Sequence, residues 1–254
     1  AARIALPSAK IKTENNASKI DEKKVTTYLT ADAAKDYKAA ENEVVETVDA
    51  VPANTKLIDV YDGKVSMESF VASLDDTQLA NLANGISGAS TSGDTWGADA
   101  NSVTGAAGET SQLYFNSLGI PNTVEADGPA GIRVTAETTD KDGNAVYNYC
   151  TAFPIGTLLA QTWNTDLVNR VGKAIGEEMV EIGVTLWLAP GMNIHRDPLC
   201  GRNFEYYSED PYLAGKTGAA MVRGIQSQHI GASVKHFAAN NKETNRKDSD
   251  SRVS

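Results

Sequence analysis

Residues 189–211 read A-P-G-M-N-I-H-R-D-P-L-C-G-R-N-F-E-Y-Y-S-E-D-P and decide the fold predicted for this chain. The stretch follows an apolar run, residues 184–188, and precedes a helix-like segment that begins at Pro211. It mixes paired charges with His, Asn, Gly and Pro, a combination that a simple connecting loop does not need. Loops of this kind that follow buried strands are usually rigid, and functional sites are built on them.

Helix-like and strand-like segments alternate around this stretch. Residues 164–182 predict a helix that Gly183 ends, and residues 184–188 predict a buried strand. Residues 211–229 predict the next helix, with Asp210 as its N-cap and Pro211 in its first turn. The inward face of the first helix is expected to carry Leu167, Val171, Ile175, Met179 and Ile182.

The same order of helix, glycine and strand occurs three times along the chain. Residues 109–118 predict a helix before a strand at 120–126, and a third strand is predicted at 232–234. Such alternation predicts an α/β fold with a parallel sheet. Glycine-rich phosphate loops do not follow these strands, so the pattern favours a barrel over a dinucleotide-binding fold.

Upstream of this repeat the sequence is more polar. Residues 66–85 predict a helix capped by Ser73 or Asp75, and residues 57–61 predict a short strand before a turn. Residues 25–51 predict either a surface helix or a partly ordered linker. Residues 87–108 predict a long loop in which Trp96 lies near a pocket or acts as a buried anchor.

Three segments of the chain resemble glycoside hydrolase family 3 of the β-glucosidase type. They are E-A-D-G-P-A-G-I-R at 125–133, the run N-I-H-R through D-P-Y-L at 193–213, and S-V-K-H-F-A-A-N-N-K-E at 233–243. The resemblance implies a partial (β/α)8 TIM-type barrel of a multidomain glycosidase, since whole barrels take about 250 residues. Residues 1–65 are then a linker or an extension from a preceding domain, and residues 66–254 are the first part of the barrel.

Polar side chains follow each predicted strand, at the edge where sites form in parallel sheets. Asp127 ends the first strand in a tight turn, where its carboxylate either accepts hydrogen bonds from sugar hydroxyls or caps the turn. The resemblance implies substrate binding by Asp127, Arg202, Lys235 and His236. Arg133 is expected either to orient Asp127 for the sugar or to form a structural ion pair with it.

The resemblance also implies where the catalytic carboxylates lie. A retaining glycosidase needs a nucleophile and an acid/base about 5 Å apart. The family's nucleophile is an Asp in a Ser-Asp-Trp type motif after the Lys-His pair, and residues 237–254 contain no such motif. The family's acid/base is a Glu on a second domain. Both are expected outside this chain, whose ends look cut, so the chain alone is expected to be inactive and to need the rest of the enzyme as its partner.

The function implied is hydrolysis of terminal β-linked glucose, with a β-glucoside or oligosaccharide as substrate. A β-xylosidase, or a non-catalytic sugar-binding homologue or fragment, is the alternative. Lys-His-Phe-Ala-Ala-Asn-Asn fits the glucosidase and xylosidase branch and departs from the N-acetylglucosaminidase branch. Linkage, aglycone, compartment and a homo-oligomeric state are left open.

Composition excludes several other functions. The net charge of −10 argues against nucleic-acid binding, and no apolar run is long enough to span a membrane. Two cysteines make neither a disulfide framework nor a zinc motif, and the three histidines are too dispersed for a metal site, so no cofactor is expected. Within the loop, His195 is expected to stabilise the chain, and Arg196 to pair with Asp197.

Overall fold

The computed structural model describes residues 48–49, 51–52, 54–85, 100, 102–140, 142–246 and 248, and the backbone of residues 12–14 and 17–19. The expectations for Trp96 and for most of residues 25–51 lie outside these residues. The first elements, β1 (Lys12–Glu14) and β2 (Ala17–Lys19), form an antiparallel pair.

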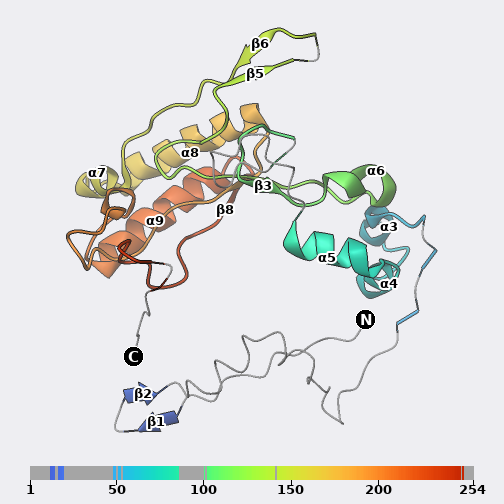
Figure 1. The fold of residues 1–254 in the computed structure, drawn as a ribbon, viewed down its shortest axis with the longest axis horizontal. Coiled ribbons are helices and arrows are strands. Elements are labelled where there is room, and N and C mark those ends of the chain that lie inside the picture. Colours follow the sequence, from blue (N-terminus) through green and yellow to red (C-terminus); the bar gives the residue numbers. More distant parts are fainter. Residues whose placement is uncertain are drawn as a thin grey trace.

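A four-stranded sheet carries the rest of the fold (Figure 1). Its strands are β3 (Gly108–Glu109), β4 (Val124–Ala126), β7 (Leu186–Trp187) and β8 (Gly231–Ala232), in that order. β4, β7 and β8 run parallel, whereas β3 pairs with β4 antiparallel. The predicted parallel sheet is therefore confirmed, with strands shorter than the apolar runs suggested.

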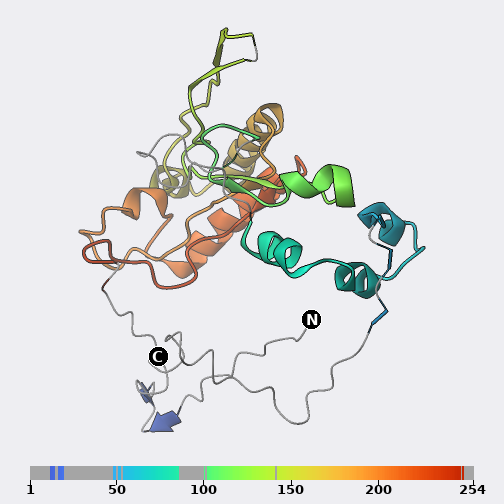
Figure 2. The ribbon, with the colours of Figure 1, turned by 45° about the vertical axis from the view of Figure 1, so that its right-hand side comes forward.

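Two long helices connect these strands and pack along each other, as Figures 1 and 2 both show. In α8 (Thr165–Ile182), the Asn164 side chain accepts hydrogen bonds from two backbone N–H groups of the first turn, and Gly183 ends the helix at φ +90°. In α9 (Pro211–Gln226), Asp210 caps the first turn in the same way. Both helices are confirmed, although α9 stops three residues before the predicted end at His229.

The core lies between these helices and the sheet. Ile175 and Met179 face inward as predicted, and they meet Met221 and Ile225 of α9 and Trp187 of β7. Trp187 is fully buried, and its indole N–H donates to the carbonyl oxygen of Gly128 at 3.0 Å. The core thus holds the loop after β4 directly, which matters because that loop carries Asp127.

A smaller helical unit forms from α3 (Leu57–Tyr61), α4 (Met67–Ala72) and α5 (Asp76–Asn84). The strand predicted at 57–61 is wrong: Leu57 and Val60 lie on one face of α3 and pack on Phe70 and Leu74, which suits a helical period. Residues 66–85 form two helices rather than one. Ser73 ends α4, whereas Asp75 caps α5.

The helix predicted at 109–118 is also corrected. Its first residues enter β3, because the backbone N–H of Thr110 bonds to Thr123 across the strands. Only a 3-10 turn, η1 (Gln112–Tyr114), and the short α6 (Phe115–Leu118) are helical, and Gly119 ends α6 in the left-handed conformation.

The hairpin of β5 (Glu137–Thr139) and β6 (Ala145–Tyr147) projects away from the sheet in Figure 1. It was not predicted, and neither was the short helix α7 (Gly156–Gln161). The described residues form an open sheet with three parallel strands and no closed barrel. The partial barrel and the domain boundary at residue 65 therefore stay predictions.

Candidate functional site

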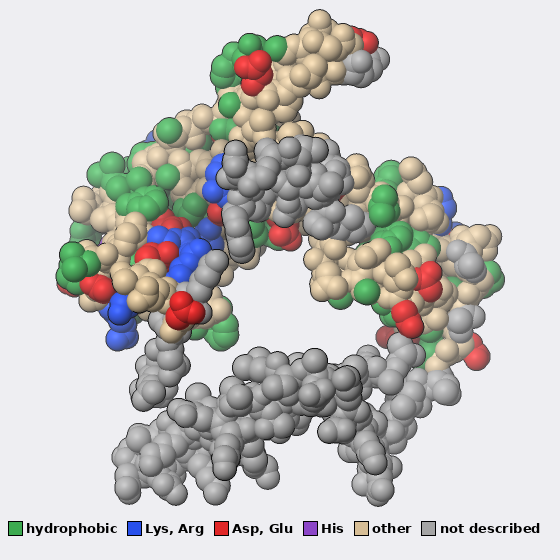
Figure 3. Space-filling view, viewed as in Figure 1, with side chains coloured by type: hydrophobic (Ala, Val, Ile, Leu, Met, Phe, Trp, Pro, Cys, Tyr) green, Lys and Arg blue, Asp and Glu red, His purple; other side chains and the backbone are tan. Residues whose placement is uncertain are grey.

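A cavity of about 520 Å³ opens at the carboxyl ends of the parallel strands. Residues from all three strand ends contribute to it: Asp127 follows β4, Leu188 follows β7 and Lys235 follows β8. Figure 3 shows Lys and Arg side chains gathered with acidic ones on this part of the molecule. The lining consists of Ala107, Asp127, Gly128, Pro129, Arg133, Leu188, Arg202, Phe204, Glu205, Lys235 and Arg246.

The loop after β4 is shaped by two glycines. Gly128 and Gly131 have φ of +119° and +129°, and a Cβ on Gly128 would lie 1.8 Å from the carbonyl oxygen of Gly131. Only glycine fits so tight a turn. The loop closes where the Arg133 N–H donates to the Asp127 carbonyl at 2.9 Å. The turn therefore holds Asp127 and Arg133 side by side at the mouth of the cavity.

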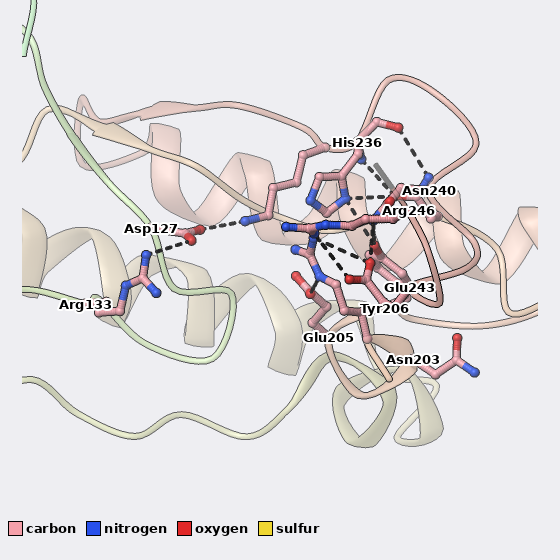
Figure 4. Close-up of polar contacts among 12 residues, drawn as sticks. Asp127, Arg133, Asn203, Glu205, Tyr206, His236, Asn240, Glu243 and Arg246 are labelled. Atoms are coloured by element: carbon pink, nitrogen blue, oxygen red, sulfur yellow. Dashed lines mark hydrogen bonds and ion pairs between the residues drawn. The ribbon is translucent and has the colours of Figure 1, made fainter. Parts of the chain in front are cut away.

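The Asp127 carboxylate lies between two cations (Figure 4). Its Oδ1 is 2.6 Å from Nζ of Lys235, and its Oδ2 is 3.2 Å from Nη2 of Arg133. Partial burial by itself raises the pKa of Asp127, but the hydrogen bond and charge of Lys235 outweigh it, so this pKa lies below its usual value. Asp127 is therefore ionised at neutral pH. Arg133 was expected either to orient Asp127 for the sugar or to form a structural ion pair with it. The ion pair is present, and it is compatible with both roles.

Lys235 owes its position to backbone pairing beyond β8. Its N–H donates to the carbonyl of Pro190 at 3.0 Å, and its carbonyl accepts from the N–H of Met192 at 2.7 Å. The Lys235–His236, Phe237–Ala238 and Ala189–Pro190 peptide bonds are cis. The backbone pairing with Pro190 and Met192 brings Lys235 to Asp127, although 108 residues separate the two in sequence.

Arg202 forms the second ionic group of the cavity. Its Nε donates to Glu205, which lies in η2 (Asn203–Glu205) and is 4% exposed. Nη1 of Arg202 lies 3.9 Å from Glu243, which also pairs with Arg246 at 3.2 Å. The contact with Glu205 holds the guanidinium of Arg202 in place. The other oxygen of Glu205, Oε2, is buried without a hydrogen-bond partner among the described residues.

The loop beneath Arg202 is fixed by His195 and Thr157. Nε2 of His195 donates to the carbonyl oxygens of Asn203 at 2.9 Å and Tyr206 at 3.1 Å, and the hydroxyl of Thr157 also donates to both. The stabilising role predicted for His195 is confirmed. The predicted Arg196–Asp197 ion pair is wrong. Asp197 instead accepts a hydrogen bond from the N–H of Leu199 through its side chain and one from Nδ2 of Asn203 through its carbonyl.

His236 follows the cavity-lining Lys235 and is partly exposed, but it is not itself among the residues that line the cavity, unlike the other four predicted substrate-binding residues. Its ring Nδ1 lies 3.1 Å from the hydroxyl of Tyr206 and 3.0 Å from Oδ1 of Asn193. Burial, together with the positive charges of Arg202 and Lys235, lowers the pKa of His236 to about 4. The ring is therefore neutral at pH 7.

This pKa predicts a specific response to acid. Between about pH 6.5 and pH 4 the unfolded chain binds a proton at His236 that the folded chain does not bind, so the folded state loses stability as the pH falls through this window. In the His236→Gln variant that loss is expected to disappear. Thermal unfolding measured at pH 7 and pH 4.5 should show a smaller fall in Tm for the variant than for the wild type. An equal fall in both proteins would contradict the assignment.

Arg246 and Phe204 line the cavity but were missed in the sequence. For Arg246 a signal was available, because Asn240, Glu243 and Arg246 recur three residues apart just after the Lys-His pair. Phe204 is half-exposed and, together with Ala107, Pro129 and Leu188, gives the cavity apolar surface beside its charged groups.

Comparison with known sequences identifies the family. The sequence profile of the glycosyl hydrolase family 3 N-terminal domain matches residues 108–251, which span every strand of the four-stranded sheet and every cavity-lining residue except Ala107. The chain belongs to glycosyl hydrolase family 3. This confirms the resemblance found in the three motifs.

Relatives within family 3 are similar over much of the chain. Beta-glucosidase A of Butyrivibrio fibrisolvens is 50% identical over 199 residues, which are 78% of this chain and 21% of that protein. An exo-alpha-(1->6)-L-arabinopyranosidase of Bifidobacterium longum is 46% identical over 142 residues, 54% of this chain and 18% of that protein. The chain thus spans about a fifth of the length of the relatives it matches.

Solved structures give the same picture. Beta-glucosidase 3B from Thermotoga neapolitana, in complex with glucose, is 57% identical with a TM-score of 0.53, over 57% of this chain and 19% of that chain. A beta-glucosidase from Paenibacillus barengoltzii is 38% identical with a TM-score of 0.61, over 80% of this chain and 20% of that chain. The mixed α/β architecture is therefore that of family 3 proteins.

The described residues offer no site for a metal ion, because no three His, Cys, Asp or Glu side chains gather closely enough to bind one. None of the described helices is both long and apolar enough to cross a bilayer. The chemistry available at the cavity is hydrogen bonding by charged groups, with Asp127 and Glu205 as acceptors and Arg133, Arg202, Lys235 and Arg246 as donors.

Proposed function

We propose that this chain is the sugar-binding part of a retaining β-glucosidase that removes terminal non-reducing β-D-glucosyl residues. The observation that carries the proposal is the Asp127–Lys235 pair at the mouth of the cavity, joined by Arg133, in a chain of family 3. Asp127 follows β4 and Lys235 follows β8, so the pair can hold one small ligand between separate strand ends. Relatives named beta-glucosidase support the substrate class.

The chemistry of the lining suits a neutral, hydroxyl-rich ligand. A sugar hydroxyl can donate to Asp127 while its oxygen accepts from Lys235 or Arg202. Such charge-assisted hydrogen bonds are stronger than neutral ones, and here each ionic group already has a partner that holds its orientation. Lys235 is 16% exposed, so little water competes with the ligand for its ammonium group. The site would therefore bind a sugar without large rearrangement.

The charge of the cavity lining also supports the proposal that another part of the polypeptide contributes carboxylates to the site. Four cations, Arg133, Arg202, Lys235 and Arg246, face two carboxylates, those of Asp127 and Glu205. A retaining glycosidase brings two more carboxylates to the bond that is cleaved, about 5 Å apart. We propose that the rest of the polypeptide supplies both, the nucleophile after residue 254 and the acid/base on a second domain, and that it completes the (β/α)8 barrel.

A pentopyranosidase is the second candidate. The sequence from Lys235 to Asn241 fits xylosidases as well as glucosidases, and one relative is named as an arabinopyranosidase. Xylopyranose is glucopyranose without the C6 hydroxymethyl group. L-Arabinopyranose also lacks this group and in addition has the opposite configuration at C4. A non-catalytic sugar-binding protein is the candidate from another class.

The test uses the full-length polypeptide that contains this chain, with the chain alone as its matched control. We expect the full-length protein to hydrolyse 4-nitrophenyl β-D-glucoside faster than the β-D-xyloside and the α-L-arabinopyranoside, and to release β-glucose first, as followed by NMR. The chain alone is expected to show no turnover, since both catalytic carboxylates are proposed to lie outside it. Turnover by the chain alone that is lost on replacing one of its own carboxylates would overturn this division.

A further inference from the structure

The side chain of Asn193 forms three polar contacts with His236, although 43 residues separate the two in sequence. Its side-chain Oδ1 accepts the backbone N–H of His236 at 2.8 Å and lies 3.0 Å from ring Nδ1. Its Nδ2 donates to the carbonyl oxygen of His236 at 3.2 Å. Asn193 is only 9% exposed, so these contacts are shielded from water.

The two backbone contacts decide which way the Asn193 amide faces. A backbone N–H can only donate and a carbonyl can only accept. If Oδ1 and Nδ2 of Asn193 were exchanged, the amide NH2 would face the N–H of His236 and the amide oxygen would face its carbonyl oxygen. Oδ1 must therefore be the atom beside Nδ1 of His236. Because a carbonyl-type oxygen only accepts, Nδ1 has to carry a hydrogen.

The surroundings of Tyr206 agree with this assignment. Its hydroxyl oxygen lies 3.1 Å from Nδ1 and accepts from Nδ2 of Asn240 at 2.8 Å. Nδ2 of Asn240 also donates to Glu243 at 3.2 Å, which fixes that amide in turn. If Tyr206 donated to a bare Nδ1, the lone pairs of Nδ1 and of Asn193 Oδ1 would oppose each other at 3.0 Å. Figure 4 shows the ring between Asp127 and the group of Tyr206, Asn240 and Glu243.

We propose that Asn193 is a positioning residue that holds His236 as its Nδ1–H tautomer, so that Nε2 is left as a hydrogen-bond acceptor for a hydroxyl of the bound sugar. Nε2 has no polar partner within the part of the chain that the structure describes. The charged groups that face the ring are Arg202, Lys235, Glu205 and Asp127, and burial with the two cations keeps the ring neutral. The role of the sugar rests on the proposed function, whereas the tautomer does not.

The consequence is a division of labour at the site. Lys235 and Arg202 can only donate hydrogen bonds, so each must meet a lone pair of a ligand hydroxyl. A hydroxyl that donates its proton to Nε2 keeps its lone pairs for these cations. With the other tautomer, an Nε2–H would compete with the cations for those lone pairs and leave the hydroxyl proton without an acceptor.

The tautomer can be observed directly in the full-length protein by solid-state NMR with 15N-labelled histidine imidazole at pH 7. The His236→Gln variant identifies the signals of His236. We expect its Nδ1 to resonate as a protonated nitrogen and its Nε2 as a bare one. A bare Nδ1, or two protonated nitrogens, would overturn the proposal without any need for a variant at Asn193.

Two matched variants separate the roles of Asn193 and Tyr206. Asn193→Leu removes the acceptor beside Nδ1, so Tyr206 can donate there and the ring proton is expected to move to Nε2. Tyr206→Phe leaves Asn193 in place, and the tautomer is expected to stay. If the tautomer is unchanged in Asn193→Leu, or moves in Tyr206→Phe, Asn193 does not control it.

Glucose tests the second half of the proposal with the same spectra. Added glucose should shift the Nε2 signal of the wild type, and Asn193→Leu should raise the Kd for glucose at least tenfold. If the tautomer is as expected but glucose leaves Nε2 unchanged at saturation, the hydroxyl assignment is wrong. If glucose does not bind at all, the proposed function fails while the tautomer stands.

Discussion

Replacing Asp127 by alanine in the full-length protein is expected to lower kcat/KM for an aryl β-glucoside at least tenfold. Asp127 is ionised, it is held at the cavity mouth by Lys235 and Arg133, and it is a strong acceptor for sugar hydroxyls. A hydrogen bond to a charged group contributes about 1.5–3 kcal/mol, and 1.36 kcal/mol is a factor of ten. The substitution also leaves Lys235 without its carboxylate partner, which adds to the loss.

Part of this loss should appear in kcat and not only in KM. Hydroxyl contacts remote from the bond that breaks help to hold the reacting carbon in position, so their loss raises the barrier as well as weakening binding. Asp127→Asn keeps the shape of the side chain and should lose activity too, because it cannot serve as an ionised acceptor. Measured kcat and KM for both variants show how much of the loss lies in kcat and how much in KM.

A control distinguishes sugar binding from a structural role of Asp127. Asp142 is an exposed carboxylate on the turn between β5 and β6, in the hairpin that projects away from the sheet (Figure 1), and Asp142→Ala should leave kcat/KM unchanged. If Asp127 only caps its turn, Asp127→Ala should lower Tm but leave kinetics on folded protein intact. An Asp127→Ala enzyme with unchanged kinetics would refute the sugar-binding role.

The second large effect concerns the contact of the two long helices. Gly224 of α9 lies against α8, and a Cβ placed there would be 2.2 Å from the carbonyl oxygen of Asn169 and 2.8 Å from the N of Lys173. Both atoms are backbone, so neither can move aside unless the helices separate. Gly224→Ala is therefore expected to destabilise this unit by about 3 kcal/mol, the upper part of the range for overpacking.

Gly215 provides the matched control within the same helix. A Cβ at Gly215 would meet nothing within 4 Å, so Gly215→Ala removes backbone freedom without a clash. This substitution is expected to leave Tm unchanged or to raise it slightly, since alanine is the better helix former. Thermal unfolding of full-length Gly224→Ala should show Tm lowered by roughly 5 °C or more. Equal Tm values for the two variants would show that α8 and α9 do not pack as closely as described.

The sequence by itself determined the elements that depend on local signals. The helix α8 was predicted from its repeating apolar face and the glycine that follows it, and α9 from its N-cap Asp210 and the proline in its first turn. The sequence also predicted that the glycine after α8 ends this helix and that the polar residues after each strand lie at the site. These signals act within one or two turns of the chain, so a single sequence contains them in full.

Tertiary contacts decided the remaining elements and the partners within the site. Residues 57–61 are apolar and β-branched enough to suggest a strand, but packing on Phe70 and Leu74 makes them a helix. Strands of two or three residues are too short to show a period, so the sequence could not give their register. That register brings the ammonium group of Lys235 into contact with the carboxylate of Asp127.

The fine chemistry of the site depends on the same long-range contacts. The sequence pointed to Asp127, Arg133, Arg202 and Lys235, and the structure gathers these four around one cavity. It did not show that the ring of His236 is bound to Asn193 and Tyr206. A residue type sets what a side chain can donate or accept, whereas its neighbours in the folded chain set its pKa, its tautomer and its partner.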